Sequence, residues 1–219
     1  MRTDMGGNPA CRHEAAFARL AKSRSASVQH RLIPVRMFCY NIGHQTAGQV
    51  EQMKEALKVL AELVADGVIE DYAIGGAMGA TFYLEPVVTM DLDVFVLFKD
   101  NDSLLPLQPI YDALRKRGYR PDERMPECID IGGTPVQFLP VYNKLLEDAL
   151  AHARSFDYDG VNARVLPAEY LAAISVQTGR MKDKLRVQAF LAYDQFDKEA
   201  FAAICASHGL VCPVDGGAK

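Results

Sequence analysis

Two carboxylates, Asp91 and Asp93, stand one residue apart in the most hydrophobic segment of the chain, which ends in Val94–Phe98. Successive side chains of a β-strand point to opposite faces, so these two acids are expected to share one face. Burying neighbouring carboxylates is costly unless a positive charge joins them. Mg²⁺ takes oxygen ligands, typically one or two carboxylates together with substrate phosphates. The pair is therefore predicted to bind Mg²⁺ or Mn²⁺, and the alternative is two acids that face water at an exposed strand start.

A glycine pair, Gly75 and Gly76, precedes these acids and opens a run of small residues, Ala77–Tyr83, that is predicted to be a short helix. Glycine lets the backbone approach an anion closely, and free N–H groups at a helix start favour phosphate. The alternative is an ordinary turn. In this order the two features predict one half of a nucleotide site, with the glycines at the triphosphate and the acids at its metal ion.

The order G-G, spacer, T-x-D-L-D-V, here ending in Thr89–Val94, resembles the signature of the DNA-polymerase-beta-like nucleotidyltransferase superfamily. Within it, the chain is most similar to small bacterial proteins of the AbiEii toxin type, which carry a later G-R-x-K-D run. That run is Gly179–Asp183 here, and the resemblance covers residues 48–210.

This resemblance implies an α/β (α+β) protein with the minimal nucleotidyltransferase fold, a short, mixed, mostly antiparallel sheet flanked by helices. It implies that Asp91 and Asp93 are catalytic metal ligands and that Gly75, Gly76 and Thr89 bind the nucleotide. The implied reaction transfers a nucleoside monophosphate from an NTP to an acceptor hydroxyl and releases pyrophosphate. The acceptor stays open between RNA, a protein and a small molecule, and the toxin likeness implies a toxin–antitoxin pair with an antitoxin partner.

One departure concerns the third carboxylate that the superfamily places on a neighbouring strand as the base. The matching segment is Pro135–Pro140, and Gln137 occupies the expected position. An amide cannot usefully accept a proton near pH 7, although it could position a hydroxyl or lend its carbonyl to the metal. Asp130, Glu127 or, more weakly, Glu85 could instead supply the missing acid. The second hypothesis is therefore a catalytically impaired module that binds a nucleotide or a partner.

The G-R-x-K-D run lies in a basic cluster, within which Arg180 and Lys182 are predicted to bind the nucleotide. The alternative is a solvated basic face, with Asp183 paired to Arg180 or Lys184 as a minor surface effect. Two further departures flank the run, because related proteins often have Lys where Ser175 stands and Asp where Arg186 stands.

The chain is predicted to consist of an extension over 1–47, a core over 48–166, a helical segment over 167–210 and a tail over 211–219. The extension is read as mobile or upstream sequence, and a transit peptide or a basic arm are the alternatives. Hydrophobic periodicity and turn residues predict the other elements. One predicted helix begins at Gln49 and is stopped by Asp66-Gly67. The others are Leu107–Arg117, Asn143–Arg154, 168–178, 181–192 and 197–208. The predicted strands are Tyr72–Ile74, Thr89–Phe98, Asn162–Leu166, and a hairpin of Cys128–Ile131 with Pro135–Pro140.

The charge, the cysteines and the apolar runs of the chain argue against several classes of protein. The 219 residues carry a net charge of −4, with seven Lys and Arg against two Asp and Glu in residues 1–50 and an acidic remainder. An acidic body disfavours broad nucleic-acid binding, which needs a basic face. The five cysteines form no C-x-x-C pair, which favours a reduced, cytoplasmic location over zinc or disulfides. No apolar run predicts a membrane span or a secretory signal.

Overall fold

The computed structural model describes residues 46–85, 89–98 and 106–213, which all belong to one compact unit, Pro34–Lys219. The extension predicted over 1–47 lies outside the described residues except for Thr46 and Ala47. The predicted tail lies outside them beyond Pro213. The predicted division between a core and a helical segment at residue 166 stays a prediction, because both parts lie in this same unit.

A seven-stranded mixed sheet forms the centre of the described unit, with the strand order β3-β4-β5-β2-β1-β7-β6. Two neighbouring pairs, β2 with β5 and β1 with β7, are parallel, and the other four pairs are antiparallel. The strands are β1 Asp71–Ile74, β2 Leu92–Leu97, β3 Arg120–Pro121, β4 Ile129–Ile131, β5 Thr134–Pro140, β6 Arg154–Tyr158 and β7 Val161–Val165. The predicted α/β class with a short, mixed, mostly antiparallel sheet is confirmed.

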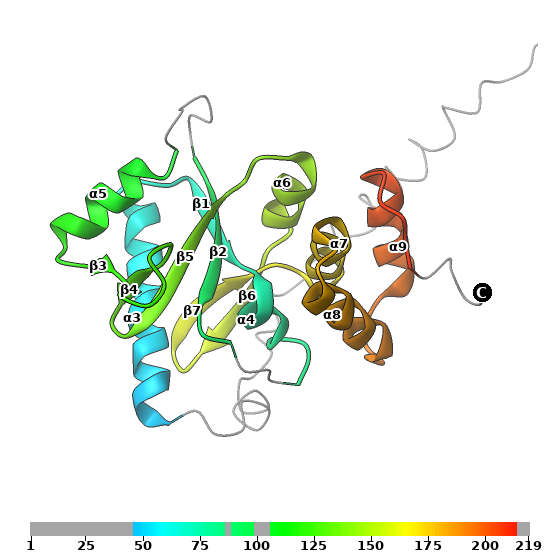
Figure 1. The fold of residues 1–219 in the computed structure, drawn as a ribbon, viewed down its shortest axis with the longest axis horizontal. Helices are drawn as coiled ribbons and strands as arrows, with labels where there is room; N and C mark the ends of the chain where they lie inside the picture. The colour runs from blue at the N-terminus through cyan, green and yellow to red at the C-terminus, as the bar shows by residue number, and fades with distance from the viewer. Residues whose placement is uncertain (1–45, 86–88, 99–105, 214–219) are drawn as a thin grey trace, which may run out of the picture. The chain divides into compact units, whose positions relative to one another are not determined.

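Helices cover both faces of this sheet (Figure 1). One face packs against α3 and α5, and the other packs against α4, α6 and the three C-terminal helices, which contact one another through α7. The described helices are α3 Ala47–Ala65, α4 Gly76–Ala80, α5 Gln108–Lys116, α6 Lys144–Ala151, α7 Ala168–Thr178, α8 Met181–Ala192 and α9 Lys198–Ser207. None of them is both long enough and apolar enough to cross a bilayer.

Strand β2 shows how alternation sorts its side chains between two cores. Leu92, Val94 and Val96 are fully buried in the core beneath α3, whereas Phe95 packs in the core formed with α6 and the C-terminal helices. Asp93 belongs to the same alternating set as Phe95, so its side chain faces the C-terminal helices. The hydrophobic pattern of the strand therefore sets the face on which its acid appears.

The structure corrects two predicted elements and adds a strand that was not predicted. The strand predicted from Thr89 begins at Leu92, so Asp91 lies just before it. The helix predicted over Asn143–Arg154 ends at Ala151, and residues 154–158 form β6 instead. A hairpin joins β6 to β7 through Asp159 and Gly160, which both have positive φ, as a tight two-residue turn requires. This Asp-Gly turn was the sequence signal that could have revealed β6.

Candidate active site

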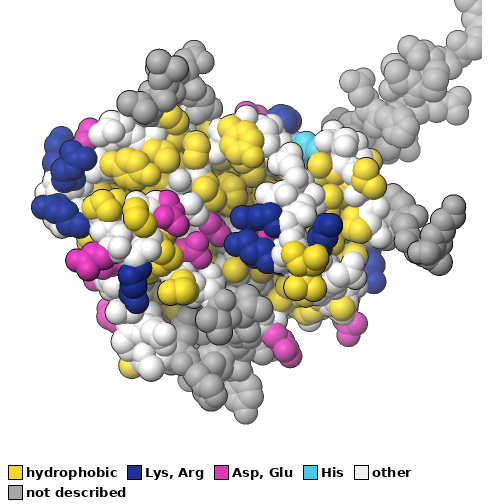
Figure 2. All heavy atoms as spheres, in the orientation of Figure 1, with side chains coloured by type: hydrophobic (Ala, Val, Ile, Leu, Met, Phe, Trp, Pro, Cys, Tyr) yellow, Lys and Arg dark blue, Asp and Glu magenta, His cyan; other side chains and the backbone are white. Residues whose placement is uncertain are grey.

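A cleft of about 1070 Å³ lies between the sheet and α8, and it brings together most of the residues that the sequence singled out. Its wall on the sheet side comes from α4 and the loop after it, the start of β2, and β5; the opposite wall comes from α8. Figure 2 shows acidic side chains in the middle of the face drawn, with Lys and Arg side chains beside them. The charged and polar residues that line the cleft are Thr81, Tyr83, Glu85, Thr89, Asp91, Asp93, Gln137, Arg180, Lys182, Arg186 and Tyr193.

The two acids of the D-x-D pattern stand on the same side of the sheet, inside this cleft. Asp93 is the second residue of β2 and Asp91 immediately precedes the strand; both are half-buried and line the cleft. The Thr89 hydroxyl donates a hydrogen bond of 3.0 Å to Asp91 Oδ1, which fixes one carboxylate from its own chain segment. Thr89 was predicted to bind the nucleotide, and in the structure it orients Asp91.

The glycine pair packs directly against Asp93. Gly76 has φ +57°, and a Cβ atom added to it would overlap the Asp93 carboxylate; a Cβ on Gly75 would overlap the Phe95 ring. The Gly75 N–H donates a 2.9 Å hydrogen bond to the Asp93 carbonyl, so the sheet uses that donor. Gly76 is therefore needed to make room for the acid and Gly75 to make room for the Phe95 ring, and a phosphate role could use only the remaining backbone of this turn.

Parallel pairing of β2 with β5 places Gln137 directly across from Asp93, and the Gln137 side chain lines the cleft. The position that the resemblance assigns to the third carboxylate therefore lies beside Asp93, and it holds an amide. Asp130 Oδ1 accepts a 2.7 Å hydrogen bond from the Gly133 N–H and closes the β4–β5 turn. Neither Asp130 nor Glu127 lines the cleft. The hypothesis that one of these two acids joins the pair finds no support.

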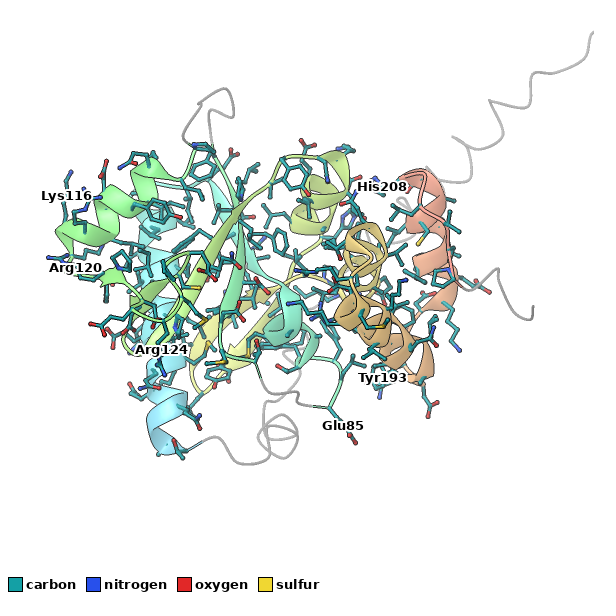
Figure 3. The ribbon with its side chains drawn as sticks, in the orientation of Figure 1. Glu85, Lys116, Arg120, Arg124, Tyr193 and His208 are labelled. Atoms are coloured by element: carbon teal, nitrogen blue, oxygen red, sulfur yellow. The ribbon has the colours of Figure 1, made fainter. Side chains whose placement is uncertain are left out.

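Glu85 lines the cleft at its mouth. It is exposed, and Figure 3 shows it on the loop that follows α4, pointing away from the strands. Among the described residues, no group of three or more Asp, Glu, His or Cys side chains could hold a metal ion together. A metal site in this cleft would therefore use two carboxylates and neutral oxygen atoms.

The start of α8 contributes the positive charge, and the structure corrects the surface pairing predicted for Asp183. This carboxylate is fully buried and accepts hydrogen bonds from Arg180 Nε at 2.6 Å, Arg186 Nη1 at 3.1 Å and Thr178 Oγ1 at 2.8 Å. Lys184 is not among its partners and does not line the cleft. Because Arg180 and Arg186 do line it, Asp183 is the anchor that holds two guanidinium groups at the cleft wall.

The two departures beside the G-R-x-K-D run have structural roles of their own. Ser175 is buried in α7, where its hydroxyl donates a 2.8 Å hydrogen bond to the Leu171 carbonyl. Arg186 is the second partner of Asp183. Between them, Gly179 takes the left-handed conformation, with φ +67°, that ends α7 and lets α8 begin at once.

The charges of the two walls act on each other. Burial, and then the neighbouring Asp91 charge, raise the pKa of Asp93 above its ordinary value, while Arg186, Lys182 and Arg180 oppose that rise. Burial of Asp183 would also raise its pKa, but the hydrogen bonds from Arg180 and Thr178 and the charges of Arg180 and Arg186 outweigh it and hold the pKa low. The environment therefore disfavours the ionised form of Asp93 and favours the ionised form of Asp183.

The donor set fits a hard divalent cation. Asp91 and Asp93 offer carboxylate oxygens, Gln137 offers an amide carbonyl, and the missing side chain of Gly76 leaves the Asp93 carboxylate the space that it occupies. Oxygen ligands of this kind suit Mg²⁺ or Mn²⁺, and a cation would relieve the repulsion that raises the pKa of Asp93.

Sequence reasoning did not identify the apolar part of the cleft. On α8 the charged positions near its start are followed by Leu185, Ala189 and Ala192, and by Tyr193 at its end, all of which line the cleft. Leu185 is 65% exposed, which is unusual for a leucine. Spacing of three and four residues from Lys182 to Tyr193 is the signal that could have revealed this face. Tyr83, which also lines the cleft, donates a hydrogen bond from its hydroxyl to the Leu166 carbonyl.

The fold and the cleft thus define a mixed α/β protein with paired acids facing a basic helix. No protein-family model matches the chain, and no curated protein matches it. Among solved structures it is similar to an antigenic nucleotidyltransferase-like protein from Paracoccidioides brasiliensis, with 13% identity and a TM-score of 0.46 over 73% of this chain and 89% of that chain.

Two structures of ANT(2″)-Ia are also similar to this chain. In the complex with adenylyl-2″-tobramycin the identity is 15% and the TM-score 0.43, over 73% of this chain and 95% of that one. The solution structure of this antibiotic-resistance factor has the same identity and TM-score, over 75% of this chain and 93% of that one. At these values the likeness carries no weight for the chemistry of the cleft, which is inferred from its own residues. The closer similarity to AbiEii toxin-type proteins stays a prediction.

Gly76→Ala is expected to disrupt the acid pair, because the new methyl group would occupy the space of the Asp93 carboxylate. We expect Mn²⁺ binding, measured by electron paramagnetic resonance, to weaken at least about tenfold. Gly209→Ala is the matched control, since Gly209 has φ +65° but no atom near its added Cβ. It should show only the backbone strain of about 1–2 kcal/mol. Equal Mn²⁺ affinity in the two variants would contradict the proposed crowding.

Asp93→Asn is expected to stabilise the metal-free protein at pH 7, because it removes a charge that burial and Asp91 both disfavour. The gain should be roughly 2–4 °C in Tm, or about 1 kcal/mol. Since the pKa is higher in the folded state, the cost of the charged form is full above the folded pKa and disappears as the pH falls below the unfolded pKa. The gain measured in EDTA should therefore shrink towards pH 4. Glu199→Gln removes an exposed acid elsewhere and is the control. A lower Tm of Asp93→Asn than of the wild type at pH 7 would refute this account.

Proposed function

We propose that the protein binds an NTP together with Mg²⁺ or Mn²⁺ in this cleft and transfers its nucleoside monophosphate to an acceptor, releasing pyrophosphate. The observation that carries the proposal is the placement of Asp91 and Asp93 on one side of the sheet, facing three cations on α8 across an open cleft. An acid pair alone would be a solvated strand end. Facing a basic wall, it becomes a site for a metal ion and a polyphosphate.

Each wall has its own task. Asp91 and Asp93 would hold the cation, which when bound neutralises phosphate charge and supports displacement at the α-phosphorus. Arg180 and Arg186, held by Asp183, present guanidinium groups whose geometry matches phosphate oxygens, and the exposed Lys182 adds a mobile point charge. Gly75 and Gly76 would keep the backbone near the metal free of side chains.

The rest of the cleft offers a place for the base of the nucleotide. Leu185, Ala189 and Tyr193 on α8 and Leu84 on the opposite side form an apolar lining beyond the cations. A ring system could lie there without specific hydrogen bonds. This arrangement supports nucleotide binding and leaves the choice of NTP open.

The second candidate function is a module on the same fold that binds a nucleotide or a partner without turnover. The observation that favours it is the position of Gln137 opposite Asp93, where a carboxylate base would stand. Transfer of label from the NTP separates the two candidates. The enzyme is the first choice, because the acids and the cations that bind the phosphates are all present.

The proposals for the acceptor and the biological setting rest on the sequence resemblance. The resemblance of the G-G…D-x-D and G-R-x-K-D runs to AbiEii toxin-type proteins supports a toxin–antitoxin pair with an antitoxin partner, and RNA, a protein or a small molecule as acceptor. Among the described residues, Cys128 and Cys212 are buried thiols outside any disulfide, which supports a reducing, cytoplasmic location.

The Asp91→Asn/Asp93→Asn double variant tests the metal-dependent site. Isothermal titration with ATP should show an affinity loss of at least about tenfold in Mg²⁺, because the metal contribution is removed. In EDTA the affinity should not fall, because the variant then removes only two negative charges beside the anion. Transfer from α-labelled ATP should fall to background. Glu199→Gln is the control for a lost exposed charge. An unchanged Mg²⁺-dependent affinity in the double variant would remove both candidate functions.

Asp183→Asn tests the anchor of the basic wall. The buried amide cannot balance Arg180 and Arg186, so we expect a stability loss of about 3 kcal/mol and an ATP affinity roughly tenfold lower, with Mn²⁺ binding retained. Asp197→Ala is the control for destabilisation alone, since it removes the N-cap of α9 outside the cleft at about 1 kcal/mol. If both variants lost ATP affinity equally, Asp183 would have only a general structural role.

A further inference from the structure

The residue opposite Asp93 decides what kind of group can attack the nucleotide. A hydroxyl acceptor must lose its proton as it bonds to phosphorus, and a positioned base normally takes that proton. Gln137 is neutral and has no such capacity. Of the described residues that line the cleft, the only other carboxylate besides the two proposed metal ligands is Glu85, which points away at the mouth.

The presence of Gln137 in place of a carboxylate also changes the charge of the cleft. An amide in place of a carboxylate leaves one negative charge fewer beside the α8 cations Arg180, Lys182 and Arg186. A site with a third carboxylate repels an anionic acceptor, whereas this one is more tolerant of it. The cleft is also large, since about 1070 Å³ exceeds the usual range of roughly 300–1,000 Å³ for one ligand. It has room for an NTP and a small second molecule.

We propose that the acceptor attacks with an oxygen that is already ionised, the terminal phosphate of a phosphate monoester, so that the product is a phosphoanhydride. This inference rests on the proposed nucleotidyl transfer. An acceptor phosphate oxygen bonds to the α-phosphorus while the bond from that phosphorus to the oxygen bridging the β-phosphate breaks. The electron pair of the broken bond leaves with pyrophosphate. No proton is transferred, so Gln137 needs only to position the acceptor through its amide.

A phosphate fits the wall better than a carboxylate does. It carries close to two negative charges at pH 7, with a second pKa of about 6, and offers three acceptor oxygens. Arg180 and Arg186 are guanidinium donors with the fork geometry that phosphate accepts, and the exposed Lys182 adds a third cation.

The test uses matched acceptor pairs with α-labelled ATP and Mg²⁺: adenosine 5′-phosphate against adenosine, and glucose 6-phosphate against glucose, with acetate as a carboxylate. We expect labelled, phosphatase-resistant product from the two phosphates at rates at least about tenfold above the other three. Calorimetry should show adenosine 5′-phosphate binding to the complex with a non-hydrolysable ATP analogue, and Lys182→Ala should weaken that binding.

Gln137→Glu is the decisive variant, because it keeps the shape of the side chain and adds both a charge and a base. It should weaken binding of adenosine 5′-phosphate several-fold and shift transfer towards adenosine. Gln137→Asp serves if the first variant does not fold.

Equal use of adenosine and adenosine 5′-phosphate by the wild type, transfer to acetate alone, or an unchanged preference in the variants would overturn the inference. Binding of Mg²⁺–ATP without any transfer to the phosphates would overturn it too, while leaving the nucleotide site intact. Failure of the wild type to bind Mg²⁺–ATP would instead remove the proposed function itself.

Discussion

Repulsion between two carboxylates at the start of β2 is the constraint around which the cleft is arranged. Asp91 and Asp93 share one side of the sheet, and the half-buried Asp93 has a raised pKa because its charge is poorly solvated and has a like charge beside it. Folding alone would not favour such a pair. Each nearby feature lowers its cost or keeps it in place: the Thr89 hydroxyl on Asp91, Gly76, which leaves space for the Asp93 carboxylate, and the cations across the cleft. A site that is costly when empty gains most from a cation, which is the usual compromise between stability and function.

Asp183 gives the opposite wall its rigidity. A fully buried carboxylate bound by two guanidinium groups is strongly coupled to the fold, because removing either side leaves an uncompensated charge. Gly179 ends α7 and turns the chain directly into α8, so the same five-residue run supplies the turn, the anchor and two of the cations. The positions of Arg180 and Arg186 at the cleft therefore depend on how α7 and α8 pack, whereas Lys182 is an exposed side chain.

Local patterns predicted much of this from sequence, and tertiary packing explains what they missed. Alternation along β2 placed Asp91 and Asp93 on one side, an inference that needs only a period of two. The family resemblance placed Gln137 at the third-carboxylate position on a neighbouring strand, and the β2–β5 pairing that sets it opposite Asp93 comes from the structure. The spacing of Asp183 to Arg180 and Arg186 was equally visible, but its burial was not, because burial depends on the helices that pack over it. The start of β2 was predicted too early because Thr89–Asp91 continues the strand pattern in the sequence. In the structure the Thr89 hydroxyl bonds to the Asp91 carboxylate within this segment, and the strand begins after it.

The position of Gln137 shows why a fold cannot specify a reaction by itself. Parallel pairing of β2 with β5 fixes where its side chain stands, and that geometry would be the same for glutamate. What differs is one unit of charge and the ability to take a proton. Because the cations of α8 already offset Asp91 and Asp93 in part, a neutral residue moves the balance of the cleft towards anionic ligands. A single side chain, isosteric with its acidic counterpart, can thus change which ligands are compatible with the cleft while every helix and strand, and both aspartates, stay in place.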